Sequence, residues 1–161
     1  MRRVIAMMVF AWGCAPARAP IPLPANSPDS IVLERTACFG ICPVYRLSIA
    51  RTGIVAFKED SITARDKITA AEFARLNGEL AHLGFDSLPD DLEAHREYCP
   101  SSHTDAPSTF VSVFRGTSSK TVRQYHGCRG GRAVVDQLRR FEDLMDSTAH
   151  AGRWIKPMRI R

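Results

Sequence analysis

Hydrophobic and polar residues alternate in five short segments of the chain, and each of these segments predicts a β-strand. The segments are SIVLERT (30–36), YRLSIA (45–50), IVAF (54–57), TFVSVFR (109–115) and KTVRQYH (120–126). A period of two is typical of a strand that buries one of its faces. Thr52-Gly53 and Gly116 lie between neighbouring segments and supply the turns, because glycine adopts tight-turn conformations at little cost.

Two further segments have the period of an amphipathic helix. The first, residues 69–85, opens with Thr69 and Glu72, which have the spacing of a capping box. The second, residues 132–150, follows a Gly-Gly pair and repeats apolar side chains every three or four residues. The predicted order of elements is β-β-β-α-β-β-α. We therefore expect an α+β fold, a single antiparallel sheet of about five strands with two helices packed on it.

Residues 1–19 have the composition of an export signal. Two arginines precede the apolar run VIAMMVFAW (4–12), which is too short to cross a bilayer, where about 20 residues are needed. Two processing sites compete, because AWGC (11–14) resembles a bacterial lipobox and ARA (17–19) fits ordinary secretory cleavage. We expect a lipid on Cys14 and a place in the bacterial cell envelope, on the outer membrane or the periplasmic face. Secretion without a lipid is the alternative.

The remaining chain divides by composition into a tether, a domain and a tail. Residues 15–28 are rich in Pro and Ala and predict an extended tether, residues 29–150 carry the predicted elements of one α+β domain, and residues 151–161 form a basic tail. The formal charge is +5, but seven of the 22 Lys and Arg residues lie near the two ends, which leaves 15 cations against 17 acids in between. A nucleic-acid partner is therefore not expected.

The chain has five cysteines, and a lipid on Cys14 would account for the odd one. The other four are an even set in an exported protein, which is typical of a disulfide framework. Four cysteines allow three pairings, and sequence does not select among them. We prefer Cys38–Cys42, which would close a small ring between two strands, and Cys99–Cys128, which would tie down the long connection after the first helix.

Three motifs resemble domain-of-unknown-function family 6438. They are ERTACFGICPVYRLSI, which contains the CFGxCPVY pattern, HTDAPS at 103–108 and KTVRQYHGC at 120–128, in this order. Ala37 stands where proline is common in the family. The resemblance implies a small bacterial envelope or secreted domain, often with a lipoprotein signal, and it implies no catalytic residues.

We expect a disulfide-stapled, non-enzymatic binding or structural module. The same cysteines permit an alternative function, the binding of zinc or copper or thiol–disulfide exchange. The C-x3-C-P spacing is similar to that of thioredoxin-like copper-handling proteins, but a strand period follows Pro43 where those proteins have a helix. A zinc site could use Cys99, His103, His126 and Cys128. The spacing of these four residues in the sequence is looser than that of known zinc motifs. We recognise no catalytic motif and expect neither an enzyme nor a bound cofactor.

One segment is a candidate ligand site. GCRGGR (127–132) precedes the second helix, so its free N–H groups could bind an anion together with Arg129 and Arg132. The alternative is a tight turn that leads into the helix. We expect the membrane as one partner, through the lipidated N-terminus, and an envelope protein or a cell-wall component as the other.

Overall fold

The computed structural model describes residues 23–24 and 27–155. The predicted export signal, Cys14, residues 15–22 and 25–26 of the tether and residues 156–161 of the basic tail lie outside the described residues. Within them, no helix has the length and apolar character that a membrane span requires.

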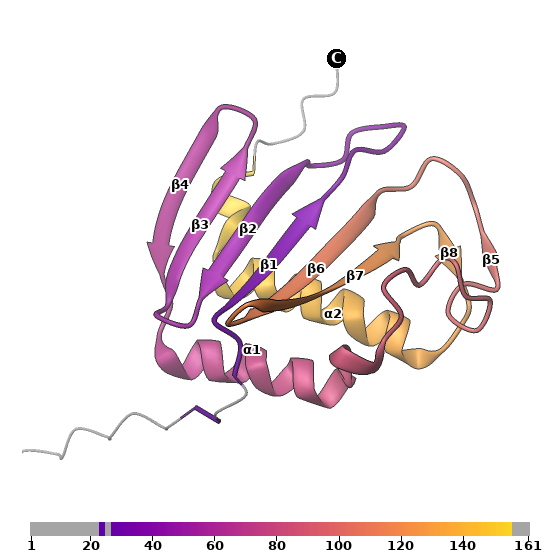
Figure 1. Ribbon diagram of the computed structural model, residues 1–161. Helices are drawn as coiled ribbons and strands as arrows, with labels where there is room; N and C mark the ends of the chain where they lie inside the picture. Colours follow the sequence, from indigo (N-terminus) through magenta and orange to yellow (C-terminus); the bar gives the residue numbers. More distant parts are fainter. Residues whose placement is uncertain (1–22, 25–26, 156–161) are drawn as a thin grey trace, which may run out of the picture.

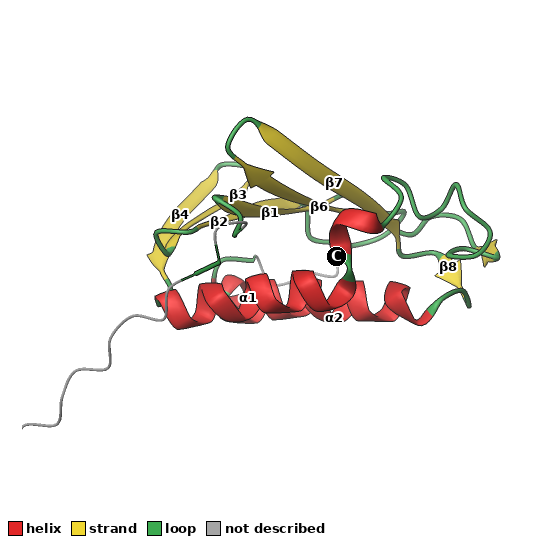
Figure 2. Ribbon diagram, turned by 60° about the horizontal axis from the view of Figure 1, so that its bottom comes forward, coloured by secondary structure: helices red, strands yellow, loops and turns green. Residues whose placement is uncertain are grey.

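Six antiparallel strands form the main sheet, in the order β4-β3-β2-β1-β6-β7, with β1 near its middle (Figure 1). The strands are β1 (Ser30–Arg35), β2 (Tyr45–Ala50), β3 (Ile54–Glu59), β4 (Ile62–Lys67), β6 (Ser108–Arg115) and β7 (Ser118–Tyr125). Two helices, α1 (Ala70–Leu83) and α2 (Ala133–Thr148), lie side by side on one face of this sheet (Figure 2). The structure is therefore an α+β fold, as the alternating pattern predicts.

The predicted number of strands was too small, and the single sheet is accompanied by a second, two-stranded one. The sequence pattern missed β4, an edge strand whose side chains are all exposed or only half-buried, so that its hydrophobic alternation is weak. It also missed β5 (Ser101–Ser102) and β8 (Cys128–Arg129), which pair with each other. Strands of two residues are too short to show a period.

The core lies between the helices and the inner face of the sheet. Alternate side chains of the central strands are fully buried there, among them Ile31, Leu33, Leu47, Ile49, Val111 and Val113. They pack against one stripe of each helix, which includes Phe73, Leu76 and Leu80 of α1 and Leu138, Phe141 and Met145 of α2. Burial of these apolar side chains is the main driving force for the fold.

Local signals place the helix ends where the sequence predicts them. Thr69 caps α1, because its Oγ1 accepts a hydrogen bond from the Glu72 N–H at 3.2 Å and its own N–H donates to Glu72 Oε2 at 2.7 Å. These hydrogen bonds, the backbone one foremost, lower the pKa of Glu72. Gly84 ends the helix in the left-handed region, with φ of 62°. The packed domain continues to Trp154, whose ring lies 5.3 Å from that of Phe57.

The two ends of β1 have different roles. The chain enters β1 at one end of the sheet, after the tether, and leaves it at the other end through the loop that leads to β2 (Figure 1). This loop contains the CFGICPV segment, which therefore lies at the end of the sheet opposite to the one where the chain enters β1.

Candidate functional site

The loop between β1 and β2, residues 36–44, exposes an unusual amount of apolar surface; we call it the stapled loop. A disulfide joins Cys38 to Cys42. Between and beside these cysteines, Phe39 is 88% exposed, Ile41 51% and Val44 48%. They are three of the four large hydrophobic side chains that are exposed in the described part of the chain. Exposed apolar groups that cluster in this way are typical of interaction sites.

Both feet of the stapled loop are bonded to one carboxylate of α2. Arg35, the last residue of β1, lies directly across from Tyr45, the first residue of β2. Arg35 Nε donates to Tyr45 Oη at 2.8 Å, and Tyr45 Oη donates to Asp146 Oδ1 at 2.7 Å. Arg35 Nη2 also donates to Asp146 Oδ2 at 2.8 Å. This arrangement, which we call the clamp, fixes the points where the loop starts and ends.

A buried glutamate extends the clamp toward β7. Glu142 of α2 is 1% exposed, and its Oε2 lies 3.3 Å from Arg35 Nη1 and 3.2 Å from His126 Nε2. His126 Nε2 lies in turn 2.5 Å from Thr109 Oγ1. Glu142 Oε1 has no hydrogen-bond partner among the described residues. A buried carboxylate needs a cationic neighbour, so Arg35 is essential to this region.

Electrostatic interactions keep the two donors of the clamp, Arg35 and Tyr45, protonated. Burial lowers the pKa of Arg35, but Asp146, Tyr45 and Glu142 outweigh it and the pKa is raised overall. Burial raises the pKa of Tyr45, and Asp146 raises it further. Arg35 therefore stays charged and the phenol stays protonated, which suits Tyr45 as a hydrogen-bond donor and not as a nucleophile.

The two other sequence motifs meet at the base of the stapled loop. The N–H of Phe39 donates to the carbonyl of Asp105 at 3.1 Å, and the N–H of Thr36 donates to the carbonyl of Ser108 at 3.0 Å, so HTDAPS lies beside the loop. His126, from the KTVRQYHGC motif, donates its backbone N–H to the carbonyl of Pro107 at 2.9 Å. Residues far apart in the sequence thus build one support for the loop.

A pocket of about 300 Å³ opens next to this support. Tyr45, Thr109 and the apolar groups of Cys42, Pro43, Pro107 and Ile155 line it, together with the charged groups of Arg35, Asp143 and Asp146. Arg35 and Asp146 are occupied by the clamp, whereas Asp143 is 80% exposed and lies 3.8 Å from Arg35 Nη2. The pocket offers a mainly apolar recess beside the exposed loop.

The second disulfide holds the long connection between α1 and β6. Cys99 is joined to Cys128, and both are largely buried. Together with Cys38–Cys42, this is the pairing that we preferred from the sequence. The second bridge spans 29 residues and the first spans 4. In the chain-entropy model, the longer loop stabilises the fold by roughly 3.5 kcal/mol and the shorter one by roughly 2 kcal/mol.

The predicted ligand site at GCRGGR has one arginine that is already engaged. Arg132 lies 3.5 Å from Glu97 and donates from Nη1 to Tyr98 Oη at 3.3 Å, and its guanidinium lies over the Tyr98 ring. Gly131 is held by close packing, because a Cβ there would meet the carbonyl oxygen of Tyr98 at 2.2 Å. Arg129 is exposed on β8. The segment therefore fits a tight turn before α2 better than an anion site, and ligand binding at Arg129 and Arg132 stays a prediction.

The four cysteines and the neighbouring histidines do not form a metal site in this arrangement. Cys99 and Cys128 bond to each other, and His126 turns toward Thr109 and Glu142. No group of His, Cys, Asp and Glu within the described residues could hold a metal ion.

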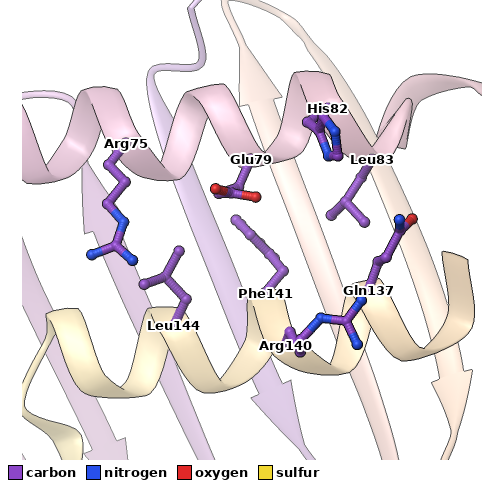
Figure 3. A pocket seen from close by; sticks show the side chains of 8 residues that line it. All are labelled: Arg75, Glu79, His82, Leu83, Gln137, Arg140, Phe141 and Leu144. Carbon is purple, nitrogen blue, oxygen red and sulfur yellow. The ribbon is translucent and has the colours of Figure 1, made fainter.

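A groove between the two antiparallel helices is a further hollow, of about 310 Å³ (Figure 3). Leu83, Phe141 and Leu144 line it with apolar groups, and its polar side chains come from both helices: Arg75, Glu79, His82, Gln137 and Arg140. Charges of both signs alternate along it, and most of these polar groups are exposed. Such a groove is usual between two packed helices, and its residues indicate no particular ligand.

The sequence analysis did not identify the clamp, although one signal was available. Leu138, Glu142, Met145 and Ala149 follow the three- and four-residue spacing of a buried helical stripe, and all four are buried. An acidic residue in such a stripe needs a cation from elsewhere in the fold. Its partner, Arg35, lies 107 residues away, which the sequence pattern does not reveal.

Comparison with known proteins supports the domain assignment. The model of a family described as a domain of unknown function, DUF6438, matches residues 29–149. The chain therefore belongs to this family. No curated protein matches it.

Removal of the clamp arginine should destabilise the whole domain. We expect Arg35→Leu to lower the free energy of unfolding by about 3 kcal/mol or more, because Glu142 would stay buried without its cation. Urea unfolding followed by circular dichroism measures the loss. The matched control is Arg46→Leu, which removes an exposed pair with Glu34 on the same sheet and should cost less than about 1 kcal/mol. Equal losses in the two variants would contradict the role of the clamp.

The two disulfides should differ in their resistance to reduction. Cys38 and Cys42 are half-buried, whereas Cys99 and Cys128 are buried. Mild reductant should therefore open Cys38–Cys42 first and leave the far-ultraviolet spectrum unchanged. Alkylation at increasing reductant concentration, followed by peptide mass spectrometry, gives the order. Thiols that appear first at Cys99 and Cys128, or loss of the fold in Cys38→Ser/Cys42→Ser, would refute this expectation.

Proposed function

We propose that this DUF6438 protein is an exported, lipid-anchored bacterial envelope protein that binds a partner through the stapled loop and catalyses no reaction. One observation carries the binding role: Phe39 and Ile41 are exposed on a loop that a disulfide and the clamp hold from two sides. Exposed apolar side chains have an unfavourable hydration free energy, which is relieved when a partner covers them. A loop that needed only to connect two strands would not require them.

The loop has the character of a preorganised binding surface. A disulfide closes it, three hydrogen bonds of the clamp fix its feet, and the backbone of residues 105–108 supports it. Ordering a loop before binding lowers the entropy cost of association. Aromatic residues such as Phe39 are also enriched in the core of protein interfaces. These features favour an envelope protein as the partner over a polar cell-wall component.

Two features support export and anchorage. Two disulfides are typical of proteins in an oxidising compartment, and they leave Cys14 as the one remaining cysteine. The apolar segment before Cys14 suits a signal, and the Pro- and Ala-rich residues after it suit a tether. Lipidation of Cys14 would keep the domain at the outer membrane or the periplasmic face.

A metal-binding or thiol-redox role on the same cysteines is less well supported. Both cysteine pairs are closed in the structure, and each holds a loop in place. His126, one candidate to activate a thiol, is bonded to Thr109 and Glu142 instead. Tyr45 stays a donor within the clamp.

Photo-crosslinking in intact cells tests the binding role. With p-benzoylphenylalanine in place of Phe39, ultraviolet light should give one discrete adduct, because this side chain would lie in the interface. The same group at Ser61, an exposed turn residue, should give no such adduct. Ile41→Ser should weaken the adduct several-fold, and the matched change Ile54→Ser, at an exposed hydrophobic residue outside the loop, should not. Identical adducts from positions 39 and 61, or none from position 39, would refute the role.

Labelling with a palmitate analogue tests the anchor separately. The wild-type protein should incorporate the label and stay with the membranes, because several acyl chains bind a bilayer firmly. Cys14→Ala should abolish labelling and release the protein. Unchanged labelling in Cys14→Ala, or a mature N-terminus at Pro20, would contradict the lipobox assignment.

A further inference from the structure

The outer face of β2, β3 and β4 carries a cluster of four cations, which we call the basic face: Arg46, Lys58, Arg65 and Lys67. The helices cover only the opposite face of the sheet (Figure 2). Lys58, Arg65 and Lys67 are all exposed. Their side chains take part in no ion pair or hydrogen bond with the described residues, whereas Arg46 forms an ion pair with Glu34 of β1.

The strand register brings these charges together at a cost. Arg46 of β2 lies directly opposite Lys58 of β3, where side chains approach to about 5 Å and like charges destabilise the pair. Lys58 lies opposite Thr63 of β4, so Arg65, two residues further along, is its diagonal neighbour.

Protection of the sheet edge explains only part of the cluster. Edge strands often carry cations that discourage pairing with other chains, which would account for Arg65 and Lys67 on β4. Arg46 and Lys58 belong to β2 and β3, which lie inside the sheet. Elsewhere on the same outer face, Arg123 of β7 is neutralised by Asp91 and Glu93. The positive charge is therefore local, in a domain whose body has more acids than cations.

The basic face also has the shape of a binding surface. The short side chains of Ser48, Ala56 and Thr63 leave a hollow of about 410 Å³ between the cations. Ile54, 43% exposed, lies beside it, across from Lys67. Cations around a shallow hollow with one apolar neighbour match a surface of phosphate headgroups and acyl chains.

We propose that the basic face binds anionic phospholipid headgroups and lays the sheet against the membrane surface. The choice of a membrane over other phosphate-bearing ligands rests on the proposed lipid anchor. The anion-binding character of the basic face does not depend on that anchor, because it follows from the residues of the face. Leu23 packs against the core and Ser27 is buried, so at most residues 15–22 remain as a tether, and eight residues reach up to about 27 Å when extended. The stapled loop, at the end of the sheet (Figure 1), stays open for its partner.

Vesicle sedimentation of the non-lipidated chain tests this proposal. In the described part of the chain, the strands and helices lie between Ser30 and Arg153, so a chain that begins at residue 20 keeps these elements and lacks the export signal. It should bind phosphatidylcholine vesicles that contain phosphatidylglycerol, should not bind pure phosphatidylcholine, and should dissociate as salt is raised. Lys58→Gln/Arg65→Gln/Lys67→Gln should weaken binding roughly 100-fold, at roughly five-fold for each cation.

The matched control is Arg75→Gln/Arg96→Gln/Arg140→Gln, which removes three exposed cations away from the basic face and should leave binding unchanged. Equal losses in both triple variants, or equal binding to both kinds of vesicle, would overturn the proposal. So would the absence of vesicle binding when inorganic phosphate alone shifts the amide resonances of Lys58 and Arg65. Each result is independent of the Cys14 labelling, so the basic face and the anchor can fail separately.

Discussion

The ion pairs between Arg35 and the acids of α2 are the constraint on which the functional end of the domain depends. Arg35 ends the strand near the middle of the sheet, and Glu142 and Asp146 lie one helical turn apart on α2. Glu142 is buried and tolerates burial only beside a cation. Its position therefore holds the end of β1 against the helix, and the stapled loop starts at the next residue. The contacts of Arg35 and Tyr45 with α2 couple the sheet–helix core to the exposed loop.

Local features of the fold followed from the sequence, and long-range ones did not. The capping box at Thr69 and Glu72 and the alternation in β1, β2 and β6 report on neighbouring residues, so pattern and structure agree. The edge strand β4 packs too little apolar surface to show a period. The clamp joins residues 107 apart, and only the folded topology brings Arg35 to Glu142. The cross-strand contact of Arg46 with Lys58 likewise depends on register, which alternation alone does not fix.

The surface of the domain separates two kinds of chemistry. The stapled loop offers apolar groups at the end of the sheet opposite to the one where the chain enters β1, and the basic face offers cations across the sheet itself. On the same outer face, Arg123 is paired with Asp91 and Glu93. A domain that lies on a membrane by one surface and meets a protein with another needs this division, because apolar and electrostatic contacts select different partners.

Backbone order in the stapled loop tests the central claim most directly, because that claim is that the clamp and the disulfide hold the exposed apolar residues rigid before any partner binds. Nuclear magnetic resonance relaxation of the oxidised protein gives order parameters for the amides of Phe39 and Ile41. Values of about 0.8 or more, near those of the rigid sheet, are the expected result. Values below about 0.6 would show a flexible connection between two strands and would contradict a preorganised binding surface.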